Sequence, residues 1–324
     1  MSSRSHTNTW TPDKYLQYQD IRERPGIELI DRLLHHYTQI QANNNTIIGY
    51  DLGCGTGNLT TILYNKLHQL YTNATINITG IDSSDSMLEK AHKNNTIQSI
   101  TYKHGDVSES FTDNDRADII YSNACFQWIH HHNTVYTNLV KQLKPHTGLL
   151  AIQIPNNFDN AYHTEITTVL EDLQLIDILP HNDGHSVGHY YSMETHTMEY
   201  YDTLLQSHCD IIDIWTTTYN QVLTGQMYAS QLSILPTDKT ALQNIQIDNV
   251  EYYHPVLNFT MGSALTAVLP KLTDQQRTEF LYLYNRRMCK KYPVQKLSDA
   301  DSNGLVQVRV LFPFQRLFLV AKRR

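Results

Sequence analysis

The stretch Tyr50-Asp-Leu-Gly-Cys-Gly-Thr-Gly-Asn58 says more about the fold of this chain than any other. It begins inside an apolar run over residues 47–52, and Asn58–Leu70, with apolar residues at helical spacing, follows the last glycine. This order predicts a buried strand, a tight turn and a helix, which together form the first unit of a doubly wound sheet. Glycines at the turn let the backbone bend sharply and let a ligand lie against bare main chain.

A second strand is expected over residues 76–81, and it ends at Asp82. Parallel strands joined by crossover helices have their carboxyl ends on one edge of the sheet, so Asp82 is expected beside the glycine turn. An acidic side chain at this place accepts hydrogen bonds from the two hydroxyl groups of a ribose. The two features together predict a ligand that contains a nucleoside.

The alternation of strand and helix continues to residue 155. Further strands are expected over residues 100–103, 118–121 and 149–154, and helices over residues 85–92 and 133–143. Asp106 follows the third strand, where a carboxylate is well placed to accept a hydrogen bond from the exocyclic amine of an adenine. Asn123 follows the fourth strand. The pattern predicts an α/β fold with a doubly wound, mostly parallel sheet.

Beyond residue 155 the pattern changes. The elements expected there are helices over 161–173 and 194–207, a strand over 211–219, mostly helix over 227–292, and apolar runs at 306–312 and 316–322 that suit a buried terminal strand. The helical block between the last two strands predicts a lid over the carboxyl edge of a seven-stranded sheet. The chain shows no internal repeat and no linker, so we expect a single domain over residues 1–324.

The composition narrows the class of protein. The chain has 324 residues, of which 40% are hydrophobic and 18% charged, as in a soluble enzyme. Its formal net charge is −7, so we expect no nucleic-acid partner. No apolar run is long enough to span a bilayer and the N-terminus lacks an apolar signal core, so we expect no membrane partner and a cytoplasmic location.

Neither the cysteines nor the histidines indicate a metal. The four cysteines are scattered without C-x-x-C spacing, and we expect reduced thiols. Three consecutive histidines, His130, His131 and His132, point in different directions on any regular element. We therefore expect no metal site at these residues.

The glycine turn resembles motif I of the class I S-adenosylmethionine-dependent methyltransferases. Asp51, Gly53, Gly55 and Gly57 have the spacing D-x-G-x-G-x-G, whereas a dinucleotide loop has the spacing G-x-G-x-x-G. The resemblance implies a Rossmann-like fold with S-adenosylmethionine as the methyl donor. The residues that it implies for donor binding are Asp51, Gly53, Cys54, Gly55, Gly57, Asp82, Ser83, Met87, Asp106, Val107 and Asn123.

A more specific resemblance runs in order from Trp10 to Ala321. It is carried by Trp10-Thr-Pro-Asp-Lys-Tyr-Leu-Gln-Tyr18, Arg22-Glu-Arg-Pro25, Asn123-Ala-Cys-Phe-Gln-Trp128, Gln153-Ile-Pro-Asn-Asn157, Tyr200-Tyr-Asp-Thr-Leu-Leu205, Asp213-Ile-Trp-Thr-Thr-Thr-Tyr219 and Pro313-Phe-Gln-Arg-Leu-Phe-Leu-Val-Ala321. These segments are similar to the trans-aconitate methyltransferase family. The departures from the family pattern are Phe126, His130-His131, Gln315, and two stretches, 174–196 and 230–253, that are longer than the family requires.

The resemblance also implies how the single domain is organised. Residues 1–45 form a helical segment that covers the donor, and residues 46–155 form the donor-binding core. Residues 156–324 supply the substrate side, including a helical cap at about 222–300 and a closing strand at 315–322.

The reaction that the resemblance implies is methyl transfer to a carboxylate oxygen of a small di- or tricarboxylic acid. A carboxylate is already ionised at neutral pH, so the reaction needs no general base. It needs alignment of the reacting oxygen, methyl carbon and sulfur, and exclusion of water from the carboxylate. Arginine holds a spectator carboxylate through two parallel hydrogen bonds. The candidate substrate residues are Arg22, Arg24, Gln127, Trp128, Gln153, Asn156, His163, Tyr201, Arg309 and Arg316, and the candidates for positioning the reactants are Gln127, Trp128 and Tyr18.

The expected acid is trans-aconitate, but other functions stay open. One is methylation of a malonyl thioester on a carrier protein, or of another small carboxylic acid. Another is a protein that binds the donor without turning it over. A carrier-protein enzyme should present a basic docking patch, and the sequence shows no basic cluster beyond Arg286-Arg287 and Lys290-Lys291. We expect the protein to be a monomer.

Overall fold

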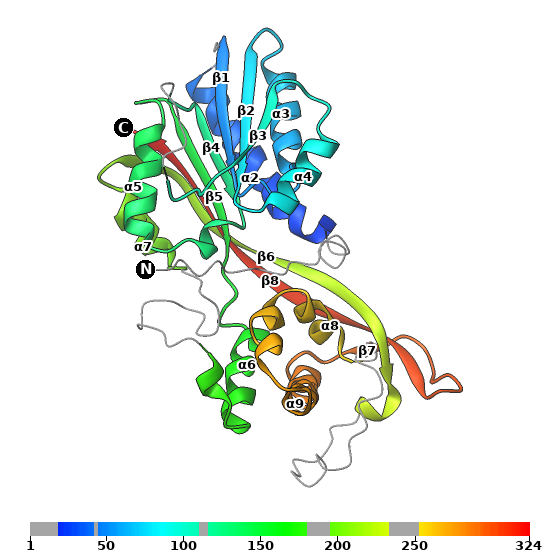
Figure 1. The fold of residues 1–324 in the computed structure, drawn as a ribbon. Helices are drawn as coiled ribbons and strands as arrows, with labels where there is room; N and C mark the ends of the chain where they lie inside the picture. Colours follow the sequence, from blue (N-terminus) through cyan, green and yellow to red (C-terminus); the bar gives the residue numbers. More distant parts are fainter. Residues whose placement is uncertain (1–18, 42–44, 110–115, 180–194, 233–252) are drawn as a thin grey trace.

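The computed structural model describes residues 19–41, 45–109, 116–179, 195–232 and 253–324 (Figure 1). Within these residues one sheet has the strand order β3-β2-β1-β4-β5-β8-β6, and β7 pairs with β8 off this path. The strands are β1 Thr46–Leu52, β2 Thr75–Asp82, β3 Ile100–His104, β4 Ile119–Asn123, β5 Leu149–Pro155, β6 Cys209–Tyr228, β7 Gln295–Lys296 and β8 Leu305–Arg323.

The first five strands are parallel to their neighbours, whereas β8 runs antiparallel to both β5 and β6. The seven strands of the continuous path confirm the expected doubly wound, mostly parallel sheet, and the two-residue strand β7 is an addition that the sequence did not predict. The carboxyl ends of the parallel strands, including Leu52, Asp82 and Asn123, lie on one edge of this sheet.

The central parallel strands β1, β4 and β5 are largely buried on both faces, which explains their continuous apolar runs, whereas β2 and the edge strand β3 alternate between buried and exposed residues. Leu149 packs in one hydrophobic cluster and Leu150 in another, because successive side chains of a strand point to opposite faces. The first cluster includes residues of α2 Gln19–Ile40, α3 Asn58–Leu70 and α4 Asp85–Asn94. The second includes residues of α5 His132–Gln142 and α7 Met198–Leu205. Helices therefore cover both faces of the sheet.

Three helices, α6 Ala161–Asp172, α8 Pro255–Met261 and α9 Asp274–Lys291, pack against the parts of β6 and β8 that continue beyond the parallel strands (Figure 1). We call these three helices the helical cap. The Arg287 guanidinium joins α9 to α6, with nitrogen–oxygen distances of 2.5 Å to both Glu165 and Asp172. On the strand side, the Phe259 ring lies 5.1 Å from that of Phe312.

The expected start of the cap at residue 222 is wrong, because β6 continues to Tyr228. Residues 222–228 pair with β8 along their whole length, which continues the strand through Gly225. A Cβ on Gly225 would lie 3.3 Å from Pro255, so this residue lets α8 approach the strand.

The closing strand is longer than expected. It extends from Leu305 to Arg323, through Pro313, and so joins the two apolar runs noted in the sequence. Proline removes a backbone donor, so it is tolerated where a strand is paired on one side only. Pro313 meets this condition, because β5 ends opposite Arg316 and β7 reaches only Arg309.

The remaining elements are short. The helix expected over 194–207 is α7, which begins after Thr197, whose hydroxyl accepts a hydrogen bond from the Tyr200 amide. Short 3₁₀ helices are η1 Phe126–Trp128, η2 Ile176–Ile178, η3 Ala229–Gln231, η6 Ala264–Ala267 and η7 Leu269–Lys271.

Among the residues that the structure describes, no helix combines the length and the apolarity that crossing a membrane requires. The two long stretches, 174–196 and 230–253, fall largely outside the described residues.

Candidate active site

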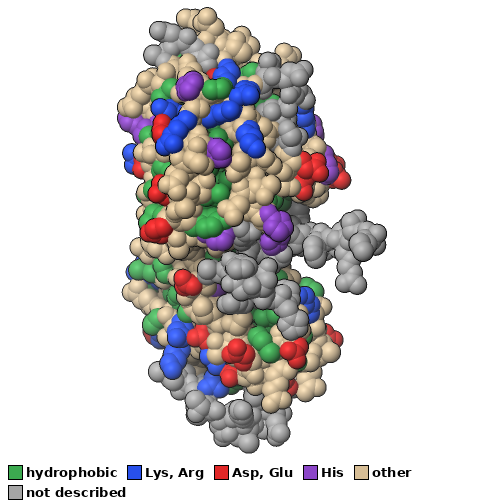
Figure 2. All heavy atoms as spheres, turned by 90° about the vertical axis from the view of Figure 1, so that its left-hand side faces the viewer, with side chains coloured by type: hydrophobic (Ala, Val, Ile, Leu, Met, Phe, Trp, Pro, Cys, Tyr) green, Lys and Arg blue, Asp and Glu red, His purple; other side chains and the backbone are tan. Residues whose placement is uncertain are grey.

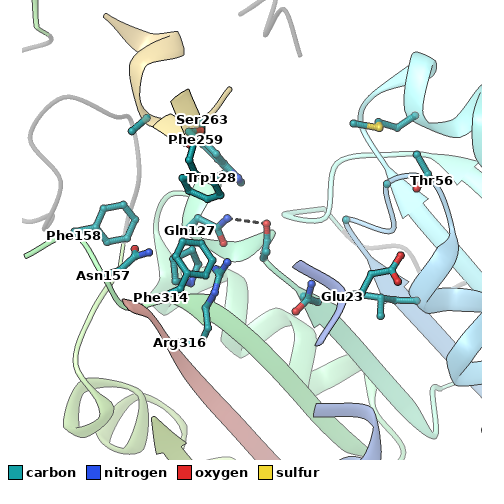
Figure 3. A pocket seen from close by; sticks show the side chains of 18 of the residues that line it. Glu23, Thr56, Gln127, Trp128, Asn157, Phe158, Phe259, Ser263, Phe314 and Arg316 are labelled. Atoms are coloured by element: carbon teal, nitrogen blue, oxygen red, sulfur yellow. Dashed lines mark hydrogen bonds between the residues drawn. The ribbon is translucent and has the colours of Figure 1, made fainter. Parts of the chain in front are cut away.

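A cavity lies at the carboxyl edge of the sheet, between the glycine turn and the helical cap (Figure 3). Its walls come from α2, the glycine turn, η1, the segment after β5, the cap and β8. The described residues that line it are Glu23, Gly53, Cys54, Gly55, Thr56, Asn58, Leu59, Met87, Asn123, Ala124, Gln127, Trp128, Pro155, Asn157, Phe158, Tyr162, His163, Phe259, Ser263, Ala264, Phe314 and Arg316.

The glycine turn presents bare main chain to the cavity, as the sequence predicted. Gly53, Gly55 and Gly57 have φ angles of 72°, 55° and 81°, in the region that side chains disfavour. A Cβ on Gly55 would meet no described atom within 4 Å, so the space beside this residue is open. By contrast, a Cβ on Gly57 would lie 2.2 Å from the Tyr102 hydroxyl. Gly55 is therefore the glycine beside which a ligand fits.

Asp82 holds the turn in place. Its Oδ2 accepts a hydrogen bond from the Gly55 amide over 2.8 Å, and its Oδ1 accepts one from the Ser84 amide over 2.9 Å. The side chain is half-buried and is not among the described residues that line the cavity. Each carboxylate oxygen has a second lone pair, so the predicted contact with ribose hydroxyls stays compatible with these bonds.

Asp51 lies beneath the turn rather than in it. The side chain is 2% exposed, and its Oδ2 accepts a hydrogen bond from the Thr60 hydroxyl over 2.6 Å. Burial and the nearby Asp82 charge raise the pKa of Asp51 to about 7, against the lowering effect of the bond from Thr60. Asp51 therefore ties the first strand to α3 and is not among the described lining residues.

The other predicted donor residues divide into two groups. Cys54, Met87 and Asn123 line the cavity. Ser83 and Asp106 are exposed and Val107 is buried in the core, and none of the three is among the described lining residues. The Asp106 carboxylate accepts hydrogen bonds from the amide and hydroxyl groups of Ser108.

The opposite end of the cavity has a cationic anchor. Arg316 projects from β8, is 4% exposed, and its guanidinium carbon lies 3.9 Å from the centroid of the Phe314 ring. Asn157 and Gln127, each 3% exposed, lie beside it (Figure 3). Burial lowers the pKa of His163 to about 3, so this imidazole is neutral at pH 7. Arg316 is therefore the residue of this end that can pair with a carboxylate.

Three buried oxygens indicate that the cavity takes a polar ligand. Asn123 Oδ1, Gln127 Oε1 and Asn157 Oδ1 have no hydrogen-bond partner among the described residues. Buried polar atoms without a partner are rare, and all three residues line the cavity. The open space at Gly55 and the Asn123 oxygen fit a hydrogen-bond-donating ligand that lies along the turn. S-adenosylmethionine, which carries hydroxyl and ammonium donors, satisfies that requirement.

Three predicted substrate residues lie elsewhere. Arg24 is exposed, with its guanidinium carbon 5.2 Å from the centroid of the Tyr219 ring. Arg309 is exposed on β8 and donates to Gln295 over 2.7 Å. Tyr201 is 1% exposed and packs in the second hydrophobic cluster. The assignment of these residues to the cavity is wrong, because tertiary packing turns each side chain toward another element.

Tyr201 nevertheless contacts a residue that supports the cavity wall. Its hydroxyl lies 3.1 Å from His132 Nδ1, and His132 Nε2 lies 2.9 Å from the carbonyl oxygen of Phe126. Phe126 begins η1, which carries Gln127 and Trp128 into the cavity. The buried contacts from Tyr201 through His132 to Phe126 thus hold η1, whose residues Gln127 and Trp128 were predicted to form the cavity wall.

The remaining predicted substrate residues are placed as follows. Gln153 is 1% exposed, and neither it nor Asn156 is among the described lining residues. Their neighbour Asn157 takes the place in the wall that was predicted for Asn156. Tyr18 and the side chain of Arg22 lie outside the described residues.

Sequence reasoning missed Glu23 and the aromatic wall. Glu23 stands inside the segment Arg22-Glu-Arg-Pro25, where only the arginines suggested a role. Phe158, Phe259 and Phe314 come from three separate parts of the chain, and no sequence pattern brings them together. Among the described residues, no group of three or more His, Cys, Asp or Glu side chains is arranged to hold a metal ion.

Comparisons with known proteins agree with this geometry. A family model of the methyltransferase domain matches residues 43–208. The trans-aconitate 2-methyltransferase of Enterobacter sp. (strain 638) is 27% identical over 97% of this chain and 98% of its own length. That of Escherichia coli O1:K1 / APEC is 29% identical with the same coverage. A solved structure, loganic acid methyltransferase with SAH, has a TM-score of 0.59 at 10% identity, covers 100% of this chain and 98% of its own, and shares the fold.

The matched residues include Gly53, Cys54, Gly55 and Asn123, which line the cavity, and Asp82, which holds the glycine turn. The chain therefore belongs to the methyltransferase domain family and is a methyltransferase that uses S-adenosylmethionine as its methyl donor.

Proposed function

We propose that this enzyme methylates a carboxylate oxygen of a small di- or tricarboxylic acid, with trans-aconitate as the first candidate, and forms a methyl ester. The observation that carries the proposal is Arg316, a buried guanidinium that lines the cavity at the end away from the glycine turn. The relatives support the same acid, because they are named trans-aconitate 2-methyltransferases and match this chain over nearly its whole length.

The chemistry asks little of the protein beyond placement. Bound S-adenosylmethionine supplies a methyl group on a positively charged sulfur. A carboxylate has an unperturbed pKa near 4, so it reacts without a general base. His163, neutral and 6% exposed, offers hydrogen bonds rather than charge. Correct alignment of the reacting atoms supplies roughly 7–11 kcal/mol of the barrier reduction in such reactions.

Arg316 and its neighbours orient the acid. The guanidinium binds one spectator carboxylate in two-pronged geometry. Trp128 and the rings of Phe158 and Phe314 keep water away, and a less hydrated carboxylate is a better nucleophile. The residues on the acid side thus select a carboxylate and leave one of its oxygens to react.

A methyl-transfer assay over a panel of acids tests the proposal. The panel contains trans-aconitate, a saturated tricarboxylate, dicarboxylates, and a monocarboxylate on an apolar ring, and mass spectrometry identifies each ester. We expect the highest kcat/KM with a di- or tricarboxylate. A preference for the monocarboxylate would instead follow from the aromatic wall and would contradict the polyacid assignment. Turnover of a carrier-bound malonyl thioester alone, or of no acid, would support the other two alternatives.

Three further sequence-based expectations stay predictions: a monomer, a cytoplasmic location and reduced cysteines. Burial raises the pKa of the Cys54 thiol far above its ordinary value, which opposes formation of a reactive thiolate beside the donor. Light scattering during gel filtration tests the monomer.

A further inference from the structure

Two residues of opposite charge mark the two ends of the cavity. Among the described lining residues, Glu23 is the acidic one and Arg316 the basic one, whereas the imidazole of His163 is neutral at pH 7. Glu23 comes from α2 near the start of the chain and Arg316 from β8 near its end. Figure 3 shows Glu23 on the side of Thr56, and Arg316 on the opposite side with Asn157, Gln127 and Phe314. The cavity is therefore electrically polarised.

The packing of α2 against Leu59 and Tyr121 brings Glu23 to the glycine turn. A Cβ on Gly26 would lie 2.5 Å from Leu59 Cδ1 and 2.8 Å from the Tyr121 hydroxyl, so glycine lets α2 approach these two side chains without displacing them. The Tyr121 hydroxyl also donates to the Gly26 carbonyl oxygen over 3.1 Å. Glu23 precedes Gly26 by one helical turn and so lies on the same face of α2.

A hydrogen bond fixes the carboxylate of Glu23. Its Oε1 accepts from Asn58 Nδ2 over 2.8 Å. Asn58 is the first residue of α3 and directly follows Gly57, so the bond joins Glu23 to the glycine turn. The positive end of the α3 dipole lies at this terminus and favours an anion there. Glu23 is half-buried and lines the cavity with its charge held in place.

We propose that Glu23 binds the α-ammonium group of the methyl donor. The donor has two positive groups, the sulfonium and the ammonium. Transfer removes the sulfonium charge, so an anion beside it would stabilise the reactant more than the transition state and would slow the reaction. The ammonium keeps its charge throughout, so an anion beside it holds the donor without that penalty. The same carboxylate repels an acid substrate from the donor end, while Arg316 attracts it to the other.

The inference rests on the proposed function only for the position of the acid; the ammonium contact itself needs no acid. Calorimetric titration with S-adenosylhomocysteine, which keeps the ammonium and lacks the sulfonium, therefore tests Glu23 separately from the acid assay. Glu23→Gln keeps an oxygen for Asn58 and removes the charge. We expect at least about a tenfold loss of affinity, equal for S-adenosylhomocysteine and S-adenosylmethionine.

Two controls make the test specific. Glu89→Gln removes an exposed carboxylate from α4 and should leave both affinities unchanged. An S-adenosylhomocysteine analogue with hydrogen in place of the amino group should bind wild type and Glu23→Gln equally.

Three outcomes would overturn the proposal. Unchanged affinity for S-adenosylhomocysteine would remove Glu23 from the donor site. A loss confined to S-adenosylmethionine would place the carboxylate beside the sulfonium. An equal loss with the deaminated analogue would show that Glu23 only holds α2 against the turn.

Discussion

The Asp82 carboxylate and the Gly55 amide, 27 residues apart in the sequence, form a hydrogen bond of 2.8 Å that joins the end of β2 to the glycine turn. The residue that the sequence offered as a ribose acceptor therefore also shapes the main chain on which we expect the donor to lie. Its second oxygen holds the Ser84 amide at the start of α4. One side chain therefore connects the end of β2, the glycine turn and the start of α4.

Asp82→Ala should weaken S-adenosylhomocysteine binding at least tenfold in calorimetric titration. The change removes charge-assisted hydrogen bonds, each worth roughly 1.5–3 kcal/mol. Asp85→Ala is the matched control, because that side chain lies three residues away and is 92% exposed. If Asp82→Ala binds with wild-type affinity, the carboxylate neither meets the ribose nor supports the turn.

Gly55→Ala should fold but lose donor affinity. The added methyl group meets no described atom within 4 Å, so the protein has room for it, while the φ of 55° costs about 1 kcal/mol for a residue with a side chain. The methyl group would occupy the open space that we assign to the donor. Thermal unfolding and titration of the same sample separate the two effects. A strongly bound donor would mean that it lies away from Gly55.

Arg316→Ala should raise KM for a tricarboxylate and leave S-adenosylhomocysteine affinity unchanged. The lost pairing is made in a buried site and is worth about 2–3 kcal/mol, or roughly 30- to 150-fold. Arg316→Lys keeps the charge but not the two-pronged geometry, so it should restore part of the loss. An equal fall in kcat/KM for mono- and tricarboxylates would indicate a structural role.

Arg24→Ala and Arg309→Ala should leave KM for the acid unchanged, since neither side chain is among the described residues that line the cavity. Arg24→Ala should reduce the free energy of unfolding by about 0.5–1 kcal/mol, because it removes the contact with the Tyr219 ring. Steady-state kinetics and urea denaturation provide the two readouts. A raised KM in either variant would return that arginine to the acid site.

The buried Asp51 carboxyl should make stability fall as pH rises from about 4 to 7. Its pKa is about 7 in the fold and 3.8 in the reference state, so over this range the folded carboxyl holds a proton that the unfolded one has lost. The unfolded state then binds fewer protons, and the free energy of unfolding decreases with pH by up to about 4 kcal/mol.

Asp51→Asn should flatten this dependence, because an amide does not titrate and still offers an oxygen to Thr60. Urea denaturation of both proteins at intervals from pH 4 to 8 gives the two curves. Parallel curves would mean that Asp51 is ionised throughout the range.

The sequence by itself determined the donor side of this protein. Strand, turn and helix follow one another locally between β1 and α3, and the right-handed crossover rule places Asp82 and the glycine turn on one edge without further information. Gly53, Gly55, Cys54, Met87 and Asn123 were predicted there and line the cavity. Local order and a chirality rule were enough because these residues lie at the strand ends and helix starts of successive strand–helix units.

Tertiary structure decided the acid side. Arg24, Arg309 and Arg316 were all predicted from the sequence to bind the acid. In the structure Arg24 packs against the Tyr219 ring on β6, Arg309 donates to Gln295, and Arg316 is the one of the three that lines the cavity. Glu23 reaches the turn because Gly26 lets α2 pack against Tyr121, a contact across 95 residues. The direction in which a long side chain points depends on packing between elements that are distant in the sequence, so the local sequence pattern does not predict it.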